Sequence, residues 1–83
     1  MSKNIKHWLE ERDRVLRTHD VNEFKKFYEK WRRNGVYKLP LPKNDLIIRA
    51  SMEKGILAMA DATEQEIESA KIWLIGHGFK PEF

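Results

Sequence analysis

The 83-residue chain contains no cysteine. This absence excludes disulfide bonds, thiol nucleophiles, iron–sulfur ligation and cysteine-based zinc sites, and it fits a reducing compartment. The chain also lacks any apolar run that approaches the ~18 residues of a membrane span. Its first residues mix charged and apolar side chains and do not form the apolar core of a signal peptide. We therefore expect a cytoplasmic protein without a membrane segment.

Glycine and proline are also scarce, with four and three residues respectively. The four glycines are isolated or stand at expected helix ends, so there is no glycine-rich loop that could hold a phosphate. What the chain does contain is typical of a globular protein, since 41% of its residues are hydrophobic and 35% are charged. Its length allows one core, so we expect residues 1–83 to form a single domain.

Two amphipathic segments come first, at about residues 4–18 and 21–34. In each, the large apolar residues recur at helical spacing on one stripe. Asp20, followed by Glu23, is suited to cap the second helix, and Gly35 is suited to end it. Because only a short turn separates the two helices, we expect them to form an antiparallel hairpin. The apolar stripes consist of Ile5, Trp8, Leu9, Val15 and Leu16, and of Val21, Phe24, Phe27, Tyr28 and Trp31.

A third helix is expected from Asn44 or Asp45 to about residue 60, after an extended proline-containing connection. It has two apolar stripes on roughly opposite sides, which is typical of a helix that is central to a domain or shared with a partner. Gly55 within it suggests a close approach of another helix. The stripes are Leu46, Ala50 and Leu57 on one side, and Ile48, Met52, Gly55 and Met59 on the other.

A fourth helix is predicted after Thr63, which forms a capping box with Glu66. Gly78 and Pro81 are placed to end it. The sequence thus predicts an all-α fold, a compact single domain of about four helices with the third near the centre.

The residues that could carry chemistry do not assemble into a recognisable site. His7 and Glu11 share one face of the first helix, but zinc normally needs three or four ligands. His19 lies in a turn, where we expect a structural role. His77 is placed to stabilise the end of the last helix. No serine has the sequence context of a nucleophile, so we expect no catalytic residue, no metal and no cofactor.

A basic face on the second helix is the first candidate binding surface. Residues 1–43 hold 12 Lys/Arg and 6 Asp/Glu, a formal charge of +6, whereas residues 44–83 hold 4 and 7, a charge of −3. A stripe of basic residues along the second helix can neutralise nucleic-acid phosphates, or it can simply keep the protein soluble. Glu23 and Glu29 interrupt it, and no helix-turn-helix pattern accompanies it. The candidate residues are Lys26, Lys30 and Arg33, flanked by Lys25, Arg32 and Lys38.

The third helix supplies the second candidate surface. Whichever of its two apolar stripes the other helices leave uncovered would form an exposed patch, and such patches mark interaction sites. Methionine suits an adaptable contact. The candidate interaction face consists of Ile48, Met52 and Met59, and it could bind a protein partner or a second copy of the chain. The alternative is that the helix is wrapped entirely by the others.

Three short stretches carry a resemblance to a group of known proteins. They are Arg12-Asp13, the connection from Leu39-Pro40 to Asn44-Asp45, and Trp73-Leu74 followed by His77-Gly78-Phe79. In these the chain resembles small uncharacterised proteins carried by phages and other mobile elements of low-GC Gram-positive bacteria. The resemblance implies an accessory product that acts by binding, with no enzymatic activity to carry over.

Two functional hypotheses follow from the sequence. The first is a non-enzymatic protein-interaction or small regulatory module that acts through the third helix. The alternative is weak, sequence-independent nucleic-acid binding through the basic face of the second helix. An enzyme would require a pocket lined by convergent ionisable groups, which the sequence does not indicate.

Overall fold

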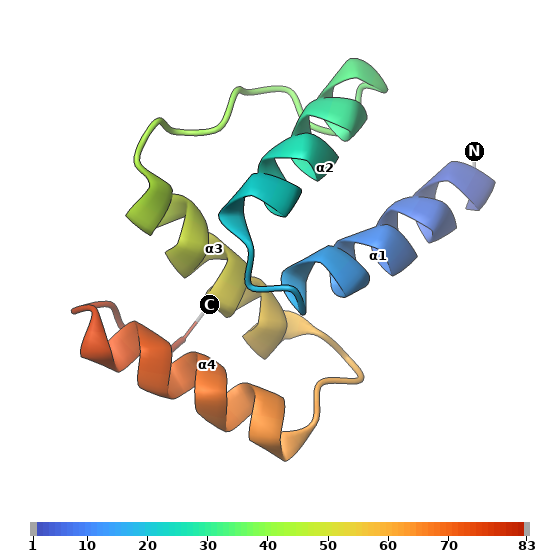
Figure 1. Ribbon diagram of the computed structural model, residues 1–83. Helices are drawn as coiled ribbons and strands as arrows, with labels where there is room; N and C mark the ends of the chain where they lie inside the picture. Colours follow the sequence, from blue (N-terminus) through green and yellow to red (C-terminus); the bar gives the residue numbers. More distant parts are fainter. Residues whose placement is uncertain (1, 83) are drawn as a thin grey trace.

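The computed structural model describes residues 2–82, which form four helices and contain no strand (Figure 1). The helices are α1 (Ser2–Leu16), α2 (Val21–Arg33), α3 (Asp45–Ala58) and α4 (Glu64–Gly76). The predicted all-α class and the number of helices are confirmed. None of these helices is both long enough and apolar enough to cross a bilayer.

The helix starts follow from the capping residues. The Asp20 carboxylate accepts hydrogen bonds from the Asn22 and Glu23 amides, and Asn44 caps α3 in the same way. Thr63 and Glu66 form the full predicted capping box at α4. At α2 the reciprocal bond is missing, because the Asp20 amide donates to the Thr18 hydroxyl instead.

The helix ends are partly as expected. Gly35 and Gly78 follow α2 and α4 with φ values of +82° and +81°, the left-handed conformation that glycine adopts without strain. The first helix ends at Leu16, two residues before the predicted boundary, because the turn continues through His19 at φ +55°.

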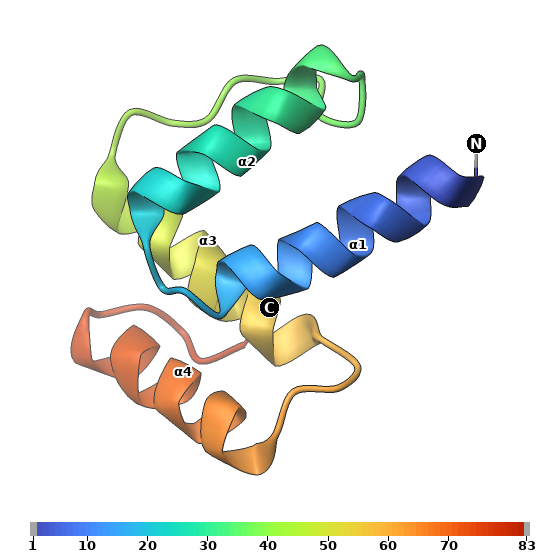
Figure 2. The ribbon, with the colours of Figure 1, turned by 45° about the vertical axis from the view of Figure 1, so that its right-hand side comes forward.

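The helices α1 and α2 form the predicted antiparallel hairpin, and it is splayed (Figures 1 and 2). Tyr37, from the loop after α2, fills part of the space between the diverging ends. Its hydroxyl accepts a hydrogen bond from Trp8 Nε1 at 3.1 Å, and its ring stacks on Tyr28 with centroids 4.0 Å apart. An aromatic cluster therefore holds the open end of the hairpin.

Helix α3 is central, with the hairpin on one side and α4 on the other (Figure 1). Gly55 faces α1, and a Cβ atom there would lie 2.9 Å from Leu16 Cδ1, so the predicted close approach is confirmed. Leu57, on another side of α3, faces α4. Both apolar stripes of this helix thus contribute to the packing, although Leu46 at its start is exposed.

The candidate interaction face on α3 was predicted wrongly. Ile48, Met52 and Met59 are 1%, 0% and 5% exposed, because the hairpin packs over them. They belong to the hydrophobic core, and no partner can contact them in this fold. The other helices therefore cover this side of the third helix, whereas Leu46 and Ile47 in its first turn remain 44% and 45% exposed.

One carboxylate, Glu53, lies in the interior with its side chain 1% exposed. Its Oε2 atom accepts from Arg49 Nε and from His19 Nδ1, each at 2.7 Å. The Arg49 guanidinium also lies over the Trp73 ring, 4.9 Å from its centroid. Through these contacts the α1–α2 turn, α3 and α4 are connected, and the structural role expected for His19 is confirmed.

Candidate interaction surfaces

All six cations of the predicted basic face are exposed, on α2 or in the loop that follows it. Three of them are paired with carboxylates. Lys30 turns towards α1, where its ammonium lies 2.9 Å from Glu11 Oε1. The other two pairs are Lys25 with Asp45, at 2.8 Å, and Arg32 with Glu29, at 3.8 Å. Half of the predicted stripe is therefore neutralised by its neighbours.

Lys26, Arg33 and Lys38 have no carboxylate within 4.0 Å among the residues that the structure describes. The loop runs beside α2, since the Tyr28 hydroxyl donates to the Leu39 carbonyl at 2.6 Å. It ends at Asp45, which pairs with Lys25, and the exposed Lys43, which sequence reasoning missed, stands two residues before Asp45. We call this area the α2–loop surface. It comprises Lys25, Lys26, Arg32, Arg33, Lys38 and Lys43 with the carboxylates of Glu23, Glu29 and Asp45, which is six positive against three negative charges.

The aromatic residues near the α2–loop surface are not arranged to stack with bases. The Tyr28 and Tyr37 rings stack on each other with an interplanar angle of 14°, and Trp8 meets Tyr37 edge-on. Burial raises the pKa of the Tyr37 hydroxyl above its usual value of 10. These rings are used in holding the hairpin together, as expected for core residues, so the α2–loop surface offers charge without stacking platforms.

Helix α4 has an outward face that the rest of the fold leaves open. Its inner side packs on α3 through Ala70 and Leu74, which are fully buried. On the opposite side Ile72 and Ile75 are 63% and 62% exposed. At 100° per residue, Glu64 and Glu68 precede these two isoleucines on the same side. We call Glu64, Glu68, Ile72 and Ile75 the α4 outer face.

Sequence reasoning missed the α4 outer face because it assigned a single apolar stripe to the last helix. That stripe, which includes Ala70 and Leu74, is the one that packs on α3. The sequence nevertheless contains a pattern that could have predicted the α4 outer face. Ile72 and Ile75 are two large apolar residues that lie off the stripe and only three positions apart.

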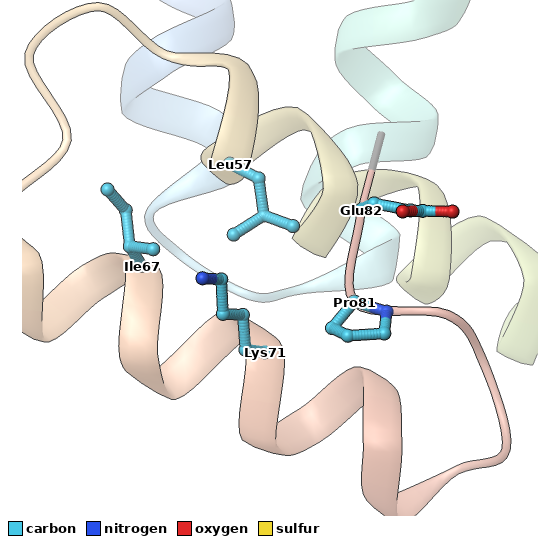
Figure 3. Close-up of a pocket in the computed structure, with 5 residues that line it drawn as sticks. All are labelled: Leu57, Ile67, Lys71, Pro81 and Glu82. Atoms are coloured by element: carbon cyan, nitrogen blue, oxygen red, sulfur yellow. The ribbon is translucent and has the colours of Figure 1, made fainter.

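A pocket of about 440 Å³ lies between α3, α4 and the segment after α4 (Figure 3). Leu57 and Ile67 form apolar walls, and Lys71 extends from α4 towards them. Pro81 and Glu82 bound the other side. Among the described residues, the ionisable groups that line it are one lysine and one glutamate, which are not the convergent acid–base groups of a catalytic site.

Glu11 and His77, two of the residues considered for metal binding, make hydrogen bonds within the fold. Glu11 bonds Lys30 and accepts from Trp31 Nε1 at 3.2 Å, and the hydrogen bond from Lys30 lowers the pKa of its carboxyl. His77 Nδ1 donates to the Trp73 carbonyl at 2.8 Å, at the end of α4 as predicted. Within residues 2–82, no three His, Asp or Glu side chains are grouped closely enough to hold a metal ion.

Helix α1 also leaves apolar side chains uncovered, beyond the point where α3 ends. Ile5 is 57% exposed and Leu9 is 38% exposed. Unlike the α4 outer face, this pair does not adjoin the pocket between α3 and α4. It is therefore useful chiefly as a control surface for the α4 outer face.

No protein-family model, no curated protein and no solved structure matches this chain. The functional inference therefore depends on the surfaces of the fold.

Proposed function

We propose that this protein is a non-enzymatic protein-interaction module and that the α4 outer face is its contact surface. The observation that carries the proposal is the exposure of Ile72 and Ile75, each above 60%, on a helix that packs only on α3. Single exposed apolar residues are normal on a protein surface. Two of them on one helical face, beside an apolar pocket, are typical of an interaction site.

The neighbouring pocket supports the same proposal. Lys71 lines it and stands four residues before Ile75, so the pocket and the isoleucine lie on the same side of α4. We also propose that the protein is an accessory product of a phage or mobile element, which the sequence resemblance supports. A cytoplasmic location is also proposed, because the absence of cysteine fits a reducing compartment.

Site-specific photo-crosslinking tests this proposal in the cells that produce the protein. A benzophenone amino acid replaces Ile72 in one variant and the equally exposed Ile5 in a control variant. We expect a covalent adduct with one protein at position 72 and not at position 5. That protein, identified by mass spectrometry and purified, should bind the wild-type chain but bind Ile72→Ala/Ile75→Ala at least tenfold more weakly. Equal binding by both chains would contradict the assignment of the surface.

Sequence-independent nucleic-acid binding is the second candidate function, and a specific observation favours it. Lys26, Arg33 and Lys38 lack carboxylate partners in the described part of the chain, and the loop adds Lys43 to them. Such cations can displace counterions from phosphates. Three of the predicted six are already paired, so binding would be weak.

Fluorescence anisotropy with labelled DNA and RNA at about 50 and 200 mM salt tests the second candidate. Phosphate-driven binding would fall steeply between these salt concentrations and would be lost in Lys26→Glu/Arg33→Glu. The matched control, Lys54→Glu/Lys80→Glu, makes the same change in net charge away from α2. Equal loss in both variants would indicate that net charge alone drives the binding, and absence of binding at either salt would exclude this function.

A further inference from the structure

The charges along the α4 outer face are unevenly distributed. Its first two turns carry Glu64 and Glu68, and its last turns carry Ile72 and Ile75. Neither carboxylate has a cationic nitrogen within 4.0 Å among the side chains of residues 5–82, whereas the inward Glu66 is bound by Arg17 at 2.7 Å. The outer face is therefore acidic at one end and apolar at the other, and the exposed Lys71, three residues after Glu68, lies at its edge beside the pocket.

A second copy of the same chain does not complement this pattern. Antiparallel pairing of two α4 outer faces would bring the carboxylates of one copy to the isoleucines of the other. Parallel pairing would bring Glu68 of each copy together, which is repulsive. The apolar area is also small, since a stable dimer usually buries about 800 Å² on each partner.

The pocket beside the face can accept a side chain. Its volume of about 440 Å³ exceeds the space that one large aliphatic or aromatic side chain fills. Leu57 and Ile67 would contact such a side chain directly (Figure 3). The aliphatic stem of Lys71 can line the pocket while its ammonium stays hydrated.

We propose that the α4 outer face binds an amphipathic helix of another protein. That helix inserts one large apolar side chain between Leu57 and Ile67, lies across Ile72 and Ile75, and presents Lys or Arg to Glu64 and Glu68 in the manner of helix-in-groove recognition. This inference rests on the proposed function, because it specifies the chemistry of the partner for the same surface.

Two synthetic peptides test the inference with the intact 83-residue protein. Both are labelled amphipathic helices of about 18 residues, long enough to be partly helical in isolation. They share one leucine stripe and differ only in flanking Lys or flanking Glu. We expect the Lys peptide to bind at least tenfold more tightly than the Glu peptide at low salt, and its affinity to fall as salt is added.

Two protein variants locate the binding. Glu64→Gln/Glu68→Gln should weaken binding of the Lys peptide about threefold to tenfold, from two exposed charge pairs. Ile72→Ala/Ile75→Ala should weaken it at least tenfold, and alanine keeps the helix propensity high. The matched controls are Glu23→Gln/Glu29→Gln on α2 and Ile5→Ala/Leu9→Ala on α1. Both controls should leave the affinity within twofold, and circular dichroism confirms that each variant folds.

The outcomes separate this inference from the function on which it rests. If both peptides bind with equal affinity and Ile72→Ala/Ile75→Ala abolishes that binding, the partner helix need not be basic. That result would overturn the inference, but the α4 outer face would remain a protein-binding surface. Binding by neither peptide would overturn the inference, while the photo-crosslinking result decides the function independently. A dimer in light scattering that Ile72→Ala/Ile75→Ala dissociates would mean that a second copy occupies the face, which also overturns the inference.

Discussion

The Arg49–Glu53 pair allows a sharp test of the core, because its two members are buried to different degrees. The Glu53 side chain is 1% exposed and the Arg49 side chain is 29% exposed. Each can be replaced by methionine, which is similar in length and carries no charge. We predict that Arg49→Met destabilises the fold much more than Glu53→Met, although both remove the same ion pair.

The difference follows from what each substitution leaves behind. Arg49→Met leaves a carboxylate in the interior with only His19 as a partner, and breaking a buried pair in this way costs about 3 kcal/mol or more. The lost contact with the Trp73 ring adds about 0.5–1 kcal/mol. Glu53→Met leaves Arg49 and His19 where water can reach them and places an apolar side chain in the interior, so it costs about 1 kcal/mol or less.

Urea unfolding followed by circular dichroism measures both free energies of unfolding. A domain of this size is stable by roughly 4–12 kcal/mol, so a loss of about 3.5–4 kcal/mol is a large fraction of the total. It should lower the melting temperature by about 14–32 °C, at about 4–8 °C for each kcal/mol. Arg33→Met, which removes an exposed arginine, is the control and should change stability by less than about 0.5 kcal/mol. If Glu53→Met costs as much as Arg49→Met, the reasoning from burial is wrong.

Three further predictions concern the helix ends and the acid limb of the stability curve. Asp20→Ala should lower the free energy of unfolding by about 1 kcal/mol through loss of the α2 cap, measured in urea. Gly35→Ala should cost about 1 kcal/mol because its φ is +82°, whereas Gly76→Ala, which has open space around it, should be neutral or stabilising; the opposite order would contradict the backbone argument. The hydrogen bond from Arg17, followed by that from the Thr63 amide, lowers the pKa of Glu66 from 4.5 to about 2. Its contribution is therefore present above pH 4.5 and lost as the pH falls towards 2, so a Glu66→Gln variant should lose less stability than wild type on acidification from pH 5 to 2.

Much of the fold was readable from local patterns. Helix caps and stops depend on a few adjacent residues, so Asp20, Thr63 and Gly78 located boundaries without knowledge of the packing. The exception was the turn after α1. There the helix ends at Leu16, and His19 adopts a left-handed conformation that is stabilised by a hydrogen bond to Glu53, 34 positions away in the sequence.

The candidate surfaces were harder to predict, since exposure is a property of the assembled fold. Ile48 and Met52 on α3 have the same apolar character as Ile72 and Ile75 on α4, yet the first pair is buried and the second is exposed. Which basic residues are paired with carboxylates could not be predicted from the sequence either. Lys30 and Lys26 belong to one predicted stripe, but only the packing of α1 against α2 pairs Lys30 with Glu11.

By itself, the sequence determined the number of helices, most of their ends, the hairpin and the central place of the third helix, because helical periodicity and capping act over one or a few turns. Only the tertiary structure decided which apolar side chains remain at the surface and which charges remain unpaired. Those properties depend on contacts between residues far apart in the chain. For that reason Ile48 and Met52 on α3 and Met59 at its C-cap lie in the core, whereas Ile72 and Ile75 on α4 remain at the surface.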